Sequence, residues 1–267
     1  MIKRFLYFLL LIVQQKSLIV SLAKREVRTQ YVGSLVGFLW TFINPMVMIF
    51  VFWVVFDIGF RVQPVKGAPF VVWLTAGMAA WFAFADIVNG SAGVIVSNAP
   101  LIKKTVFHSE ILPVVKLVSC LVTHSIFLVV LAVLIIFLRP VFSFYFFQFL
   151  YYLLCMCVLA LGLSWAVSSL NVFIRDIGQI VGVVMQMGFW ATPIFWDLGI
   201  MPPKLQAVFT LNPMFYIVQG YRESFLYFVP FWQHPYQTVY FWVVALSIFA
   251  LGGLVFKKLK PDFADVV

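Results

Sequence analysis

Long apolar stretches separated by short polar breaks dominate this sequence. As a helix, about 20 apolar residues cross the hydrocarbon core of a bilayer. Lipid offers no hydrogen-bond partners to the backbone, so apolar stretches of this kind are expected to be helical. Six such stretches predict an all-α integral membrane protein with six transmembrane helices: Leu35–Ile58, Phe70–Val88, Leu112–Leu138, Phe144–Leu170, Ile180–Phe195 and Tyr236–Phe256.

The segment before the first span, Lys16–Tyr31, has a different pattern. Its apolar residues recur at helical spacing, while Lys24, Arg25 and Arg28 fall on the other side. A basic amphipathic helix of this kind lies in the plane of the membrane surface. The alternative is a surface helix of a soluble domain, but the neighbouring sequence offers no such domain. The pattern therefore predicts an N-terminal amphipathic interface helix.

A short polar segment, Ser97–Pro113, separates the second predicted span from the third. It is too polar for hydrocarbon and too short for a soluble domain. We interpret it as a cytoplasmic helix on which a separate ATPase pushes, that is, a coupling helix. Its first half contains Asn98, Pro100, Leu101, Ile102, Lys103 and Lys104.

The region between the fifth and sixth spans, 196–235, is rich in proline and polar residues. Its apolar runs are too short to cross a membrane. Pro203 and Pro213 suit the first turn of a helix, and Asn212 is a favourable N-cap. The pattern predicts two short helices, Pro203–Thr210 and Pro213–Tyr227, that enter the outer leaflet as a re-entrant pair.

Composition and charge agree with a membrane protein and indicate its orientation. The chain is 64% hydrophobic, with a mean hydropathy of +1.07 and a net charge of +9. Its basic residues lie in short clusters beside apolar spans, which argues against nucleic-acid binding. Thirteen of the 18 Lys and Arg fall on one predicted side, which places both termini in the cytoplasm. They are Lys3, Arg4, Lys16, Lys24, Arg25, Arg28, Lys103, Lys104, Lys116, Arg175, Lys257, Lys258 and Lys260.

Two charged residues, Asp86 and Lys116, lie inside predicted spans at similar depth on either side of the polar segment. Intramembrane charges commonly pair with one another, so we predict an ion pair between these two. The alternative is that each side chain extends separately to the membrane surface.

The sequence contains none of the motifs expected of an ATPase or hydrolase. It has no GxxxxGK[ST] phosphate-binding loop, no HExxH, no GxSxG and no cluster of metal ligands. We therefore predict that the chain is not an enzyme and holds no metal or cofactor. A membrane enzyme or assembly factor is the alternative, but its chemistry needs more intramembrane His, Asp and Glu than this chain has.

Aromatic residues are abundant, at 19% of the chain. An interfacial aromatic belt accounts for most of them. Those at mid-span, beside Asn44, could instead form a wall for sugar rings, whose C–H faces are apolar. The candidate channel-lining residues are Trp40, Phe42, Asn44 and Phe52.

Five segments of the chain, in order, resemble a known family, the ABC-2 type permeases that export bacterial surface polysaccharides such as O-antigen, capsule and teichoic acid. The resemblance covers nearly the whole chain. Where this family usually has Phe-Pro after the coupling segment, the chain has Phe107 and His108. The matching segments are Arg28–Phe56, Ser97–Pro113, FIRDIGQIV at Phe173–Val181, TPIFW at Thr192–Trp196, and LNPMFYIVQGYRESF at Leu211–Phe225.

The resemblance implies one ABC-2 transmembrane domain over 1–267: an interfacial part at 1–33, a six-span part at 34–256 and a cytoplasmic tail at 257–267. It implies a homodimer in the inner membrane, bound to two copies of a separate ATPase that holds ATP and magnesium. Lys24, Arg25 and Arg28 would join the polar segment in docking that ATPase. The cargo would be a lipid-linked polysaccharide; an ABC-2 exporter of a drug or small lipid is the alternative. The outer helices would form an exit gate with Asn212, Pro213, Tyr216, Tyr221 and Arg222.

Overall fold

The computed structural model describes residues 13–30, 36–62, 67–104 and 107–266, and it is built from helices. Residues 1–12 and 31–35, which include part of the predicted interfacial segment, lie outside the described ranges. Among the described residues, five helices are long and apolar enough to cross a membrane. They are Trp40–Gly59, Phe70–Ala92, Ser109–Leu138, Phe144–Phe173 and Pro235–Val266.

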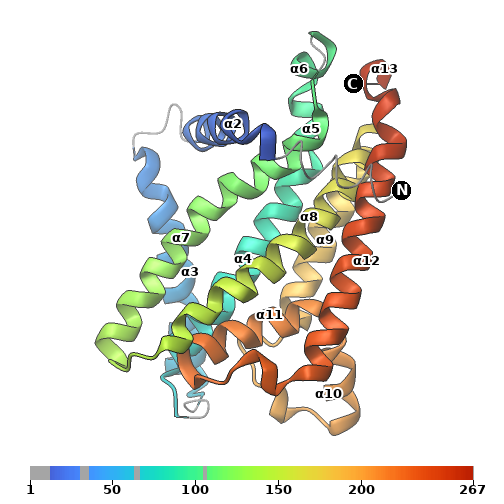
Figure 1. Cartoon of the computed structure of the whole chain (residues 1–267). Helices are drawn as coiled ribbons and strands as arrows, with labels where there is room; N and C mark the ends of the chain where they lie inside the picture. Colours follow the sequence, from blue (N-terminus) through green and yellow to red (C-terminus); the bar gives the residue numbers. More distant parts are fainter. Residues whose placement is uncertain (1–12, 31–35, 63–66, 105–106, 267) are drawn as a thin grey trace.

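The helices follow the predicted apolar stretches closely, and several begin or end at the predicted residue (Figure 1). Two of them continue as single π-helical turns, at Val54–Gly59 after α3 and at Glu223–Tyr227 after α11. In chain order they are α2 (Lys16–Thr29), α3 (Trp40–Trp53), α4 (Phe70–Ala92), α5 (Val94–Ser97), α6 (Ala99–Lys104), α7 (Leu112–Leu138), α8 (Phe149–Phe173), α9 (Asp176–Ala191), α10 (Pro203–Thr210), α11 (Pro213–Arg222), α12 (Pro235–Leu259) and α13 (Phe263–Val266).

The fifth predicted span differs most from its prediction. The helix found there, α9, has 16 residues and begins before the predicted Ile180. It ends at Ala191 because Pro193 disfavours helical backbone at the residue before it, and Thr192 is extended. Sixteen residues fall short of the roughly 20 that cross the hydrocarbon core unaided. By length alone, therefore, α9 does not qualify as a sixth span.

Helix α4 lies at the centre of the molecule, against α7, α8, α9 and α11. Nearly all of its side chains are buried, and many of them are Ala or Gly, which let the neighbouring helices approach closely. Helix α3, by contrast, exposes most of its apolar side chains, including Trp40, Met46 and Phe50. The chain thus leaves a broad apolar surface on α3.

The short helices lie at opposite ends of the long ones (Figure 1). Helices α2, α5, α6 and α13 gather at one end, which we call the α6 end, and α10 and α11 lie at the other, the α10 end. Helix α2 runs across the long helices and buries Ile19 and Ala23, packing against α7. The predicted amphipathic helix and the two short helices between α9 and α12 are therefore present as helices.

Helices α8 and α12 approach each other so closely that their glycines are in contact. A Cβ added to Gly252 would overlap the carbonyl oxygen of Gly162, whereas one added to Gly253 would meet nothing within 4 Å. We expect Gly252→Leu to force the helices apart and to lower stability by about 1–3 kcal/mol or more. Thermal unfolding of the purified protein, followed by tryptophan fluorescence, measures the effect. The matched control is Gly253→Leu, and equal midpoints for the two variants would contradict the close packing.

Candidate functional site

At the α6 end, Asn98 forms the turn between α5 and α6. Its side-chain amide nitrogen donates to the Val94 carbonyl at 2.8 Å. Its backbone carbonyl accepts from the backbone N–H groups of Leu101 and Ile102. The following residues present Pro100 and Lys103 to the exterior. The predicted coupling segment is therefore a fixed helical corner that projects from the end of the molecule (Figure 1).

Not every residue of this corner is available to a partner. Ile102 packs against a hydrophobic cluster that includes Phe256 and Phe263. Helix α13, which carries Phe263, contacts α6 directly. Ile102 thus attaches α6 to α13, whereas Pro100 and Lys103 are exposed and Leu101 is half-buried. The side chain of Lys104 lies outside what the structure describes.

The structure brings α2 and the Asn98 turn together. Lys24, Arg25 and Arg28 are all exposed, as the amphipathic pattern predicted. Arg25 and Asn98 line the same cavity of about 380 Å³ at the α6 end, and Lys116 lines it too. Arg25 of α2 and the polar turn therefore border one cavity.

The predicted ion pair between Asp86 and Lys116 is not formed. The Lys116 ammonium instead lies 2.7 Å from the Glu26 carboxylate of α2. Asp86 makes no ion pair within the described ranges, although it lies one turn before Gly90, against which the Lys116 side chain packs. The reason is that α2 folds over α7 and places a carboxylate nearer to Lys116 than the one on α4.

A double-mutant cycle distinguishes these two partners of Lys116. We expect Glu26→Gln and Lys116→Met to be coupled by about 0.5–1 kcal/mol, because the pair is partly exposed. The cycle of Asp86→Asn with Lys116→Met is the comparison and should show a smaller coupling, because these two charges attract each other without forming an ion pair. Thermal or denaturant unfolding of the unchanged protein, the three single variants and the two double variants provides the energies. A larger coupling in the Asp86 cycle would contradict the assignment.

A second ion pair at the α6 end was not predicted from the sequence. Lys260 donates to the Glu110 carboxylate at 2.5 Å, and His108 Nδ1 lies 3.5 Å from the same group. The Glu110 carbonyl also accepts from the indole of Trp165 at 3.1 Å. Glu110 is almost fully buried, so it ties the polar segment to α8 and to the end of α12. A lone carboxylate just before an apolar span is the only signal in the sequence.

At the α10 end, Asn212 and Tyr216 anchor α11. Asn212 caps the helix by accepting from the Met214 N–H at 2.9 Å, as predicted, and its amide donates to Thr192. Pro213 occupies the first helical turn. The Tyr216 hydroxyl shares hydrogen bonds with the hydroxyls of Tyr151 and Thr238. These contacts fix α11 to the extended segment after α9, to α8 and to α12.

Tyr221 and Arg222 are buried at the other end of α11. The Tyr221 hydroxyl lies 3.0 Å from His124 Nε2. The Arg222 guanidinium donates to the carbonyls of Pro193 and Ile194 at 2.8 and 2.7 Å, and it stacks 3.5 Å over the Trp73 ring. Since Arg222 is only 2% exposed, its charge is directed at the protein's own backbone. The sequence did not indicate these backbone partners.

The four predicted channel-lining residues do not share one environment. Trp40 and Asn44 are exposed and lie one turn apart on α3. Phe42 is half-buried. Phe52 is half-buried too, and its ring lies 5.7 Å from that of Phe189 on α9. Two of the four are thus exposed on α3 and two are half-buried.

Comparison with known proteins fits this arrangement. Residues 17–226 match the family described as the ABC-2 type transporter. The chain belongs to this family. The matched region runs from α2 to the π-helical turn after α11, so it includes both ends of the molecule described above.

Curated relatives of this ABC-2 family member match it along nearly its whole length. One is the O-antigen export system permease protein RfbA of Klebsiella pneumoniae, 28% identical over 94% of this chain and 95% of the relative. RfbA of Myxococcus xanthus is 26% identical over 95% and 96%. The capsule polysaccharide export inner-membrane protein CtrC of Neisseria meningitidis serogroup A is 23% identical over 79% and 80%.

Proposed function

We propose that this chain is the membrane-spanning permease subunit of an ATP-driven exporter that moves a lipid-linked surface polysaccharide across the cytoplasmic membrane. The observation that carries the proposal is the similarity, over about 95% of both chains, to permeases named for O-antigen export. The similarity to a capsule polysaccharide export protein supports the same class of cargo.

The placement of the short helices supports six crossings with both termini in the cytoplasm. Helices α2 and α13 lie at the same end of the molecule (Figure 1), so the chain between them passes from end to end an even number of times. The five long helices make five passes, which is an odd number. We therefore assign a sixth pass to α9. The Lys and Arg distribution then assigns the α6 end to the cytoplasm.

The partner in this proposal is a separate ABC ATPase, present in two copies on a homodimer of this chain. The partner binds ATP and magnesium and hydrolyses the nucleotide, so the chain itself needs no cofactor. The docking surface consists of the corner at Asn98–Lys104 and the exposed basic residues of α2. Its support is geometric, because the corner projects from the α6 end and shares a cavity with α2.

The export path in this proposal lies between the two copies, and the apolar face of α3 contributes to it. The exposed Trp40 and Asn44 on that face support a role in the path, together with Phe42. Phe52 supports this face of α3 and does not line the path, because its ring packs against that of Phe189 on α9. The exit gate is the α10 end, whose helix α11 is anchored by Asn212, Pro213, Tyr216, Tyr221 and Arg222.

Reconstitution tests the proposal directly. The chain is placed in proteoliposomes with the ABC ATPase of its own host, and ATP hydrolysis is measured with lipid-linked glycan extracted from that host. We expect the glycan to stimulate hydrolysis, whereas the lipid carrier without glycan should not. Stimulation by small drugs or membrane lipids, with no response to the glycan, would favour the drug or small-lipid exporter and overturn the proposal.

A further inference from the structure

A cavity of about 630 Å³ with both polar and apolar groups in its lining lies at the α10 end, between the segment after α9, helix α11 and the start of α12. We call it the α10-end cavity. Its volume lies within the range of about 300–1,000 Å³ that is usual for small-molecule sites. Nine of its fourteen lining residues carry a polar or charged side chain, so the lining offers several hydrogen-bond donors and acceptors beside its apolar surface.

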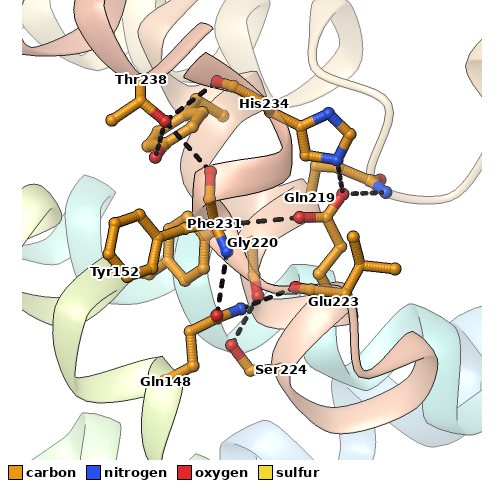
Figure 2. Close-up of polar contacts among 11 residues, drawn as sticks. Gln148, Tyr152, Gln219, Gly220, Glu223, Ser224, Phe231, His234 and Thr238 are labelled. Atoms are coloured by element: carbon orange, nitrogen blue, oxygen red, sulfur yellow. Dashed lines mark hydrogen bonds and ion pairs between the residues drawn. The ribbon is translucent and has the colours of Figure 1, made fainter. Parts of the chain in front are cut away.

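One of the lining residues of the α10-end cavity, Glu223, has its carboxylate held by three side chains. Figure 2 shows the side chains of Gln219 and His234 directed at Glu223 from neighbouring elements. Gln219 Nε2 donates to Glu223 Oε1 at 3.2 Å, and His234 Nε2 lies 3.3 Å from the same oxygen. The Tyr152 hydroxyl donates to the other oxygen at 3.4 Å. The carboxylate is therefore oriented before any ligand arrives.

Glutamine side chains are also present in the cavity lining. Gln233 and Gln237 both line the cavity and are both exposed. Neither side chain makes a hydrogen bond to another described residue. A primary amide presents one acceptor oxygen and two donor hydrogens, the complement of a pair of neighbouring hydroxyl groups.

The walls of the cavity are held in place by side chains that hydrogen-bond to backbone groups. Arg222 holds the carbonyls of Pro193 and Ile194 on one side. On the other, the Gln148 amide donates to the Val229 carbonyl at 2.9 Å and accepts from the Phe231 N–H at 3.0 Å (Figure 2). A site whose walls are already ordered loses less entropy when a ligand binds.

The charges around the cavity disfavour an anion. Asp197 and Glu223 contribute carboxylates, and the guanidinium of Arg222 is directed at backbone carbonyls. A phosphate group would therefore meet negative charge without a cation directed at it. Aromatic surface is present as well, from Phe215 and Tyr227 in the lining. Carboxylates, amides and aromatic faces together suit a neutral ligand with several hydroxyl groups and an apolar C–H face.

We propose that the α10-end cavity binds a neutral sugar residue of the exported glycan within a single subunit. This inference rests on the proposed function for the identity of the glycan, and on the cavity's own residues for the chemistry. In that role, Glu223 accepts hydrogen bonds from sugar hydroxyl groups, and Gln219 donates to their oxygens. Gln233 and Gln237 form hydrogen bonds with the remaining hydroxyl groups of the same sugar. The cavity holds the glycan at the α10 end after it has left the path between the subunits.

Saturation-transfer NMR on the full chain in lipid nanodiscs tests this site. Nanodiscs are required because glycoside detergents present sugar rings of their own. The probes are glucose, galactose, mannose, N-acetylglucosamine, inorganic phosphate, and the oligosaccharide released by mild acid from the host's lipid-linked glycan. We expect ring-proton signals from the oligosaccharide and from at least one neutral sugar. Gln233→Ala with Gln237→Ala should weaken that binding by about tenfold.

The matched control is Gln179→Ala, which removes an exposed glutamine of α9 outside the cavity and should leave binding unchanged. Absence of signal from every sugar, binding of phosphate alone, or equal binding by all variants would overturn the inference. Its failure is distinguishable from failure of the proposed function. Glycan-stimulated ATP hydrolysis measures export coupling through the whole assembly, whereas the NMR signal measures this cavity in the chain alone.

Discussion

Replacing Leu101 with aspartate and Lys103 with glutamate is expected to abolish glycan-stimulated ATP hydrolysis while the membrane part stays folded. Both residues lie on α6, the helical corner at the α6 end, and Lys103 is exposed. A buried acid in a protein interface costs several kcal/mol when it has no partner, which is enough to reduce ATPase binding by two or more orders of magnitude. Co-purification with the ATPase, together with the hydrolysis assay, measures the loss.

The control variant makes a similar charge change elsewhere at the same end. Lys258→Glu reverses an exposed charge near the end of α12, outside α6, and should leave co-purification close to normal. Ile102 is left intact because it packs against the cluster around Phe263, so its replacement would mix loss of docking with loss of packing. Retained co-purification and hydrolysis in the α6 variant would refute the docking role.

Replacing Arg222 with methionine is expected to produce the largest loss of stability of any single substitution at the α10 end. The change removes a buried cation and leaves the carbonyls of Pro193 and Ile194 without their donors. Breaking a buried charged network of this kind costs about 3–5 kcal/mol. We expect the thermal midpoint to fall by at least about 5 °C and export to stop.

Two further variants separate the role of Arg222 from a general effect of charge. Lys204→Met removes an exposed cation from α10 at the same end and should leave the midpoint unchanged. Arg222→Lys keeps the charge but loses the planar fork that reaches two carbonyls at once, so it should recover only part of the stability. A midpoint for Arg222→Met equal to that of Lys204→Met would contradict the structure.

The helices themselves were largely predictable because the signals that set them are local. The apolar run Leu112–Leu138 became α7 with the same bounds, and Pro203–Thr210 became α10. Asn212 was identified as an N-cap because its side chain bonds a backbone group two residues away. The fifth span was placed too late, since Pro193 limits α9 at its end and the polar start at Asp176 still folds as helix.

The polar contacts between helices were not predictable in the same way. Lys116 was assigned to Asp86 because both lie inside apolar spans, yet it pairs with Glu26, 90 residues away. Lys260 pairs with Glu110 across 150 residues. No spacing rule in the sequence connects such residues, and the choice between two nearby carboxylates depends on how α2 crosses α7.

The sequence by itself determined that the chain is helical and apolar enough for a membrane. It also determined that two polar segments, Ser97–Pro113 and 196–235, interrupt the apolar stretches. These features were predictable because hydropathy and capping act over a few residues. Tertiary structure alone decided which polar groups meet: the Glu26 and Lys116 pair, the backbone partners of Arg222, and the carboxylate and amides around the α10-end cavity. The reason is that these contacts follow from the packing of helices distant in sequence, and close contacts such as that of Gly162 with Gly252 set that packing.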